Sequence, residues 1–126
     1  MTGSVPDLLA LAHDDLLLAR RDRESGSPRH AVSRAYYAVL HAAVAARAAR
    51  GERPKTHAGV RMLFGPLFVQ NGPFEKRHAR VLDELARLRN DADYHVGREV
   101  SLDAAREAVV DAETFVADVK AWIDAQ

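Results

Sequence analysis

Residues 28–50 read PRHAVSRAYYAVLHAAVAARAAR, and this stretch decides the fold. Ser27 and Pro28 are suited to cap a helix and to occupy its first turn, and Gly51 is suited to end it. Between them apolar residues recur at steps of three and four, which predicts one long α-helix. One stripe of this helix is typical of a core and contains Val32, Tyr36, Val39 and Ala43. A second stripe consists of small residues that permit close approach of another helix, namely Ala31, Ala35, Ala38, Ala42 and Ala45.

Glycine and proline divide the remaining chain into segments that also carry helical periodicity. The expected helices run from about Pro6 to Arg23, from Pro28 to about Arg50, from a Thr56 cap to a break at Gly65-Pro66, from Gly72-Pro73 to about Tyr94, and from a Ser101 cap to Ile123. No stretch shows the alternation of a strand, and no internal repeat is visible. The sequence therefore predicts an all-α, up-and-down bundle of four to five helices in a single domain over residues 1–126.

The composition bounds the location of the protein and its partners. Hydrophobic residues make up 48% of the chain and charged residues 29%, a profile typical of soluble globular proteins. No apolar run approaches the roughly 20 residues that cross a bilayer, and the first residues lack the features of a signal peptide. We therefore expect a cytoplasmic protein with no membrane partner. The 18 basic and 18 acidic residues cancel, so any nucleic acid must be bound by a local basic cluster.

Several common chemistries find no support in the sequence. The chain has no cysteine, which excludes disulfides and thiolate metal ligands. Its 6 histidines include no HxxxH or HExxH pair, so we expect no metal site. There is no glycine-rich phosphate loop after a strand and no GxSxG elbow, which argues against a serine hydrolase.

Residues 88–95, LRNDADYH, concentrate polar side chains at the end of the fourth expected helix. At about 100° per residue, the buried face of this helix is marked by Leu85, Leu88 and Ala92. Arg89 borders one edge of that face and His95 the other, roughly 120° apart on an ideal helix. They are therefore not natural neighbours within one chain. If the end of the stripe packs against a second copy, two-fold symmetry could bring both residues of both chains into one cleft.

A purely structural interpretation of these residues stays open at this point. An arginine at the edge of an apolar stripe commonly covers apolar surface with its stem. A histidine near a helix end is commonly solvated or stabilises the helix dipole. The pairs Asp91–His95 and Arg89–Asp93 are also ordinary helix-supporting pairs four residues apart.

The second expected helix presents a companion face. Arg34 and His41 are two turns apart and nearly superimposed, with Tyr37 beside them. These side chains are candidates to extend a cleft for substrate.

Three segments resemble prokaryotic HEPN-domain proteins, specifically a subgroup with an SRAYYAxxH signature and a later Ala-Asp-Tyr. They are AVSRAYYAVLHAA (31–43), KTHAG (55–59) and RNDADY (89–94). Their order and spacing cover residues 31–94, and the flanking helices fit a HEPN bundle. Together the segments are fairly specific, although none would suffice alone.

The resemblance implies a metal-independent endoribonuclease that needs no cofactor. HEPN ribonucleases share an Arg-x4–6-His motif, and Arg89, Asn90 and His95 fit it with five intervening residues. Family members typically dimerise so that both motifs line one cleft, which implies a homodimer through the motif-bearing helices and an RNA substrate. His95 would then assist proton transfer and Arg89 would stabilise charge on the phosphate, while Asn90 would orient either group.

Further substrate-binding candidates are Arg34, Tyr37, His41 and Tyr94. Many HEPN proteins are toxins paired with a small nucleotidyltransferase (MNT) antitoxin. In one group the antitoxin adenylylates a tyrosine two residues after the motif histidine, whereas here Val96 and Gly97 follow His95 and Tyr94 precedes it. This departure keeps an alternative open: a non-catalytic HEPN module that binds a nucleotidyltransferase or a nucleotide.

Overall fold

The computed structural model describes residues 3–94 and 99–126. These residues form five α-helices, one π-helical segment and no strand. The elements, in chain order, are α1 (Val5–Glu24), α2 (Pro28–Ala49), α3 (His57–Phe64), the π-helical η1 (Gly65–Gln70), α4 (Lys76–Tyr94) and α5 (Leu102–Asp124). The prediction of an all-α bundle is confirmed.

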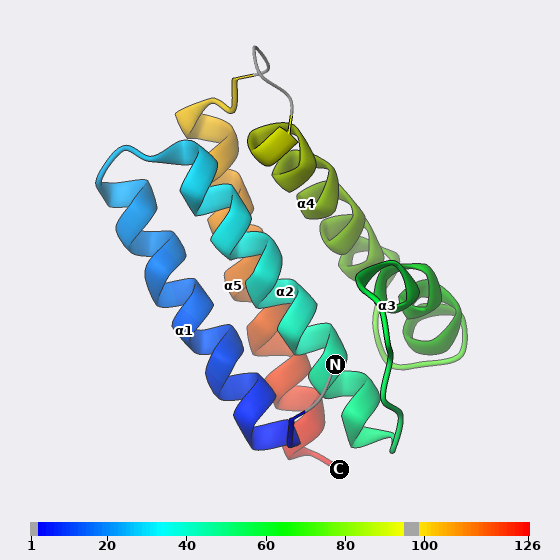
Figure 1. Cartoon of the computed structure of the whole chain (residues 1–126). Coiled ribbons are helices and arrows are strands. Elements are labelled where there is room, and N and C mark those ends of the chain that lie inside the picture. Colours follow the sequence, from blue (N-terminus) through cyan, green and yellow to red (C-terminus); the bar gives the residue numbers. More distant parts are fainter. Residues whose placement is uncertain (1–2, 95–98) are drawn as a thin grey trace.

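Helix α2 is the central element of the bundle. It packs against α1 and α5 on one side and against α4 on the other, and these long helices alternate in direction (Figure 1). The shorter α3 lies beside α4 near the end of the bundle that also holds both termini. No helix in the described part of the chain is long and apolar enough to span a membrane.

The pattern on α2 explains its central position. All five alanines of the predicted small-residue stripe have 0% exposure, so α2 approaches its neighbours closely. The predicted core stripe is confirmed as well, with exposures of 0% for Val32, Val39 and Ala43 and 2% for Tyr36. A helix that is apolar nearly all round belongs at the centre of a bundle.

The helix starts were predicted with mixed success. Side-chain caps at Thr56 and Ser101 are confirmed, because their hydroxyls accept the N–H groups of Gly59 at 2.9 Å and Ala104 at 3.0 Å. Ser27 is the N-cap residue of α2 and Pro28 occupies the first turn, as predicted, but the side chain of Ser27 makes no capping hydrogen bond. The Ser27 hydroxyl instead lies 3.5 Å from that of Ser25.

The predicted break at Gly65-Pro66 was wrong in part. The α-helix α3 does end at Phe64, but the chain continues as the π-helical segment η1. Pro66 lies in the first turn of that segment. Phe68 of this π-helical segment is fully buried. Its ring stacks on that of Phe64, with the two ring centroids 5.3 Å apart.

Helix α4 begins at Lys76 rather than at Pro73. Phe74 is buried, and its N–H donates to the Phe68 carbonyl at 2.8 Å, which holds this part of the chain as a turn. The Glu75 N–H donates to Nδ1 of His78 at 3.1 Å. The side chain of His78 therefore satisfies a backbone donor just before the helix starts.

Candidate functional site

Arg89 of α4 is held in place by contacts with α2. Its Nη2 donates a hydrogen bond to the Tyr37 hydroxyl at 2.9 Å. Its guanidinium carbon lies 5.7, 5.5 and 5.3 Å from the ring centroids of Tyr36, Tyr37 and Tyr94. Nε lies 3.0 Å from Asp93 Oδ2, an ion-pair distance, but without the direction of a hydrogen bond. The guanidinium is thus oriented by tertiary contacts in addition to the predicted pair with Asp93.

The surroundings of Arg89 keep it charged. Partial burial by itself would lower its pKa, but the ionisable oxygens of Tyr37, Tyr94 and Asp93 outweigh that effect and raise the pKa. A permanently charged, planar guanidinium is suited to bidentate binding of two phosphate oxygens.

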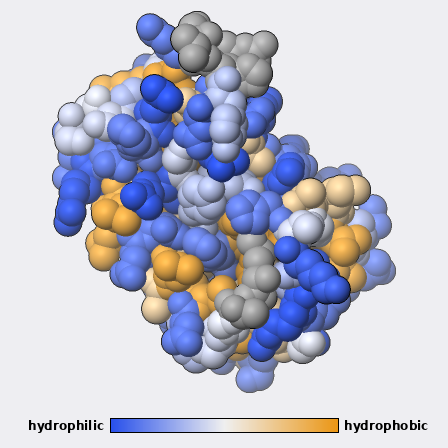
Figure 2. All heavy atoms as spheres, in the orientation of Figure 1, coloured by the Kyte–Doolittle hydropathy of each residue, from blue (hydrophilic) through white to orange (hydrophobic). Residues whose placement is uncertain are grey.

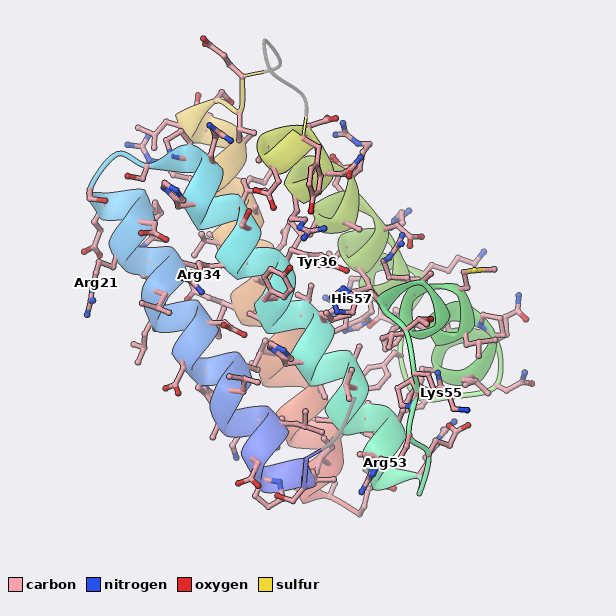
Figure 3. All side chains as sticks on the ribbon, viewed as in Figure 1. Arg21, Arg34, Tyr36, Arg53, Lys55 and His57 are labelled. Carbon is pink, nitrogen blue, oxygen red and sulfur yellow. The ribbon has the colours of Figure 1, made fainter. Side chains whose placement is uncertain are left out.

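Tyr36 and Tyr37 form an aromatic platform between α2 and α4. Their rings meet edge to face, with centroids 5.3 Å apart and an interplanar angle of 65°. Burial raises the pKa of Tyr36, and the nearby Arg61 and Arg89 only partly oppose that rise. Figure 3 shows Tyr36 on the side of α2 that faces α4, close to His57 at the start of α3.

The sequence analysis missed two basic residues of this cluster, His57 and Arg61. The His57 ring centroid lies 6.3 Å from that of Tyr36 and 6.1 Å from that of Tyr37. The pKa of His57 is lowered, first by burial and then by the positive charges of Arg89, His41 and Arg61. A signal was present, because His57 lies within the KTHAG segment (55–59) that resembles the family.

Asn90 and Arg89 line one open pocket of about 340 Å³. The pocket is bounded on the α2 and α3 sides by Tyr36 and Arg61 and on the α4 side by Asp83, Ala86 and Arg87. The face of the molecule drawn in Figure 2 is mainly hydrophilic, and hydrophobic atoms form separate spots on it. The structure thus brings the predicted residues Arg89, Asn90 and Tyr37 together.

His41 lies at the edge of this cluster and contacts it through Tyr37. Its ring stacks against that of Tyr37, with centroids 6.1 Å apart and 27° between the planes. On its other side His41 Nδ1 lies 2.6 Å from Oδ2 of Asp15, a buried residue of α1 that the sequence analysis did not single out. Asp15 is on α1 and His41 is on α2, so no short spacing in the sequence indicates that the two residues pair.

Arg34 does not join the cluster. It is exposed on the side of α2 that faces α1, whereas Tyr36 leaves the helix on the other side (Figure 3). Among the described residues it makes no hydrogen bond or ion pair.

Tyr94 is the last residue of α4, and its ring is 65% exposed. It adds an open aromatic face beside Arg89. His95, the next residue of the motif, lies outside the described residues.

The chain is similar to known proteins over nearly its whole length. The HEPN domain model matches residues 5–122. A protein of Methanocaldococcus jannaschii named "Putative toxin MJ0605" is 35% identical over 113 residues, which cover 90% of this chain and 84% of that protein. A "UPF0332 protein" of Archaeoglobus fulgidus is 34% identical over 102 residues, covering 81% of each chain.

The fold is also shared with a solved structure. The crystal structure of ST0689, an archaeal HEPN homologue, superposes with a TM-score of 0.78 over 97% of this chain and 99% of that chain, at 19% identity. At this level of identity the likeness concerns the fold alone. The sequence matches and the helical architecture agree, and the chain belongs to the HEPN domain family.

Proposed function

We propose that this chain is a metal-independent endoribonuclease and the toxin of a toxin–antitoxin pair, with a composite site of Arg89, Asn90 and His95 at a dimer interface. The observation that carries the proposal is the orientation of Arg89. Its guanidinium is held by the Tyr37 hydroxyl at 2.9 Å and lines an open pocket together with Asn90. The name of the relative from Methanocaldococcus jannaschii supports the assignment as a toxin.

The proposed reaction is an internal transfer at a phosphodiester of RNA. The ribose 2′-oxygen forms a bond to the adjacent phosphorus as the bond from phosphorus to the 5′-oxygen breaks, which leaves a 2′,3′-cyclic phosphate and a 5′-hydroxyl. One imidazole accepts the 2′-hydroxyl proton, and a proton is returned to the leaving 5′-oxygen. His95 is the residue proposed for this transfer, since its ordinary pKa is near neutrality.

Arg89 acts on the phosphate in this scheme. Negative charge builds on the phosphate oxygens in the transition state, and a preorganised cation placed there lowers the barrier without having to reorganise. The Tyr37 hydrogen bond and the flanking rings supply that preorganisation. Asn90 adds an amide that can orient a phosphate oxygen.

The dimer and the antitoxin are parts of the same proposal. Arg89 and His95 are six positions apart in the sequence, which is roughly 120° on an ideal helix, so a second copy of the chain is proposed to bring an Arg89 and a His95 together. A nucleotidyltransferase is proposed as the partner that holds the nuclease inactive.

The proposal is tested by RNA cleavage in the presence of a metal chelator. We expect the wild-type chain to cleave RNA to products with 2′,3′-cyclic phosphates. Arg89→Ala and His95→Ala should each lower the rate by about 100-fold or more, because each removes a group that stabilises the transition state. Arg106→Ala is the matched control, since the partner of Arg106 among residues 3–94 and 99–126 is Asp103, one turn earlier on α5, at 3.4 Å.

Equal rates for wild type, Arg89→Ala and His95→Ala would contradict the nuclease assignment. If the three proteins also bind a nucleotidyltransferase equally well, the alternative of a non-catalytic interaction module gains support. Melting temperatures of all variants, compared with that of the wild type, separate loss of chemistry from loss of folding.

A further inference from the structure

Four basic side chains lie around the Tyr36–Tyr37 platform, and carboxylates of the described residues pair with two of them, Asp93 with Arg89 and Asp15 with His41. Arg89 comes from α4, His57 and Arg61 come from α3, and His41 comes from α2. Among the described residues, the charged groups that act on His57 are Arg89, His41 and Arg61, all of which are basic. No carboxylate of the described residues forms an ion pair with His57 or Arg61.

Arg89, His57 and Arg61 all lie near Tyr36. Arg89 lies 5.7 Å from the Tyr36 ring centroid, and the His57 ring lies 6.3 Å from the same centroid. Arg61 lines the pocket of about 340 Å³ with Tyr36 and Arg89. Its Nε is buried and makes no hydrogen bond within the described structure. Arg61 also interacts with the Tyr36 hydroxyl through its side chain. The α3 side of the pocket thus presents positive charge that no carboxylate of the described residues pairs with.

On the opposite wall of the pocket, carboxylates lie close to the basic side chain. Arg87 is engaged by Glu84 at 2.6 Å and by Asp91 at 3.1 Å, and Asp83 lies next to it in the pocket lining. These carboxylates neutralise the α4 edge. An anion is therefore attracted toward Arg61, His57 and Arg89 rather than toward Arg87.

Like charges brought together in a partly desolvated place repel one another, and a bound anion removes that repulsion. We propose that His57 and Arg61 extend the site around Arg89 into a phosphate-binding site within one protomer, whose ligand is a backbone phosphate of single-stranded RNA. The RNA ligand rests on the proposed function, whereas the phosphate site rests on the residues themselves. The exposed ring of Tyr94, 5.3 Å from the Arg89 guanidinium, offers a surface on which an unpaired base can stack.

The first test follows the His57 imidazole by NMR during a pH titration. The pKa of free His57 is lowered first by burial and then by its basic neighbours, so a phosphate bound beside those neighbours should raise it. We expect an upward shift with inorganic phosphate and with a 2′-O-methyl RNA oligonucleotide, which cannot be cleaved. His13, an exposed histidine of α1, is the control and should not move.

The second test measures binding of the same oligonucleotide to variants. Arg61→Gln and His57→Gln should each weaken binding several-fold, and Arg61→Gln should reduce the slope of log affinity against log salt by about 0.7, the value for one phosphate contact on a single strand. Arg53→Gln is the matched control, because Arg53 lies farther back on the loop that leads into α3 (Figure 3). His57 is exposed, so its variant tests the proposal even if Arg61→Gln is unstable.

An unchanged pKa of His57 with both ligands, or wild-type binding by both variants, would overturn the proposal. A shift with inorganic phosphate but not with the oligonucleotide would overturn the assignment to RNA. Binding is measured with RNA that cannot react, so loss of this site and loss of the nuclease function give separate results.

Discussion

Two histidines of this molecule, His78 and His57, occupy opposite kinds of environment. His78 is 4% exposed in the first turn of α4, and its Nδ1 accepts the Glu75 N–H at 3.1 Å. The proton therefore resides on Nε2, which donates to Asp118 at 2.8 Å. His57 is exposed at the start of α3, and neither of its ring nitrogens makes a hydrogen bond to a described residue.

This difference separates a structural histidine from a candidate functional one. Both nitrogens of His78 are satisfied, a carboxylate lies beside it, and its ring packs 5.1 Å from that of Phe74. His57 has aromatic neighbours too, but the ionisable groups of the described residues that act on it are the basic side chains of Arg89, His41 and Arg61. Residue type alone does not distinguish the two, whereas the sign of the surrounding charge does.

The largest expected effect is on the structural side of this comparison. His78→Ala removes a buried ring and leaves the Glu75 N–H and Asp118 without their partner, so we expect the free energy of unfolding to fall by about 2–4 kcal/mol. His57→Ala should change it by less than about 0.5 kcal/mol. Urea unfolding of both variants checks the contrast, and similar losses in the two would remove the distinction drawn here.

A smaller effect is expected at the cationic cluster from Tyr37→Phe. This change deletes the hydroxyl that accepts from Arg89 Nη2 at 2.9 Å and leaves the ring in place. We expect a loss of about 1 kcal/mol in stability and a fall of roughly tenfold in RNA cleavage, because Arg89 loses one orienting bond. Wild-type cleavage by this variant would show that the rings alone orient the guanidinium.

The smallest effect concerns pH. Because the pKa of His57 is lowered in the folded chain, folding favours its neutral form. Stability is lost as the pH falls below the unfolded pKa of about 6.5 toward the folded value, and it is unaffected above that range. The melting temperature of His57→Gln should therefore fall less than that of the wild type between about pH 7.5 and about pH 5.5. Parallel curves would contradict the cationic environment assigned to His57.

Much of the fold could be predicted from local patterns. The stripes of α2 are buried as expected, and α5 buries Ala105, Val109, Ala112, Val116 and Val119 along one face. The errors lie where tertiary contacts override a local rule. Gly65-Pro66 was expected to break the helix. Instead the chain continues as a π-helical segment that has Pro66 in its first turn and buries Phe68.

The candidate site was only partly predictable. Arg89 was placed at the edge of the buried face by periodicity, and the structure shows that it is half-buried there. Asn90 was predicted as a site residue from its position next to Arg89 in the motif. His41 was paired with Arg34 by its spacing, yet its contacts in the fold are Asp15 and Tyr37. Spacing along one helix reports a shared face but not what lies opposite.

The sequence by itself determined the helices, the central position of α2 and the place of Arg89 beside a buried stripe. These features depend on residues within a few turns of one another, where the helical period relates position to direction. Only the tertiary structure decided that His57 lies near Arg89, 32 positions away in the chain. That proximity depends on how α3 packs across α2 and α4, which is decided by side-chain volumes and contacts between elements rather than by any local repeat.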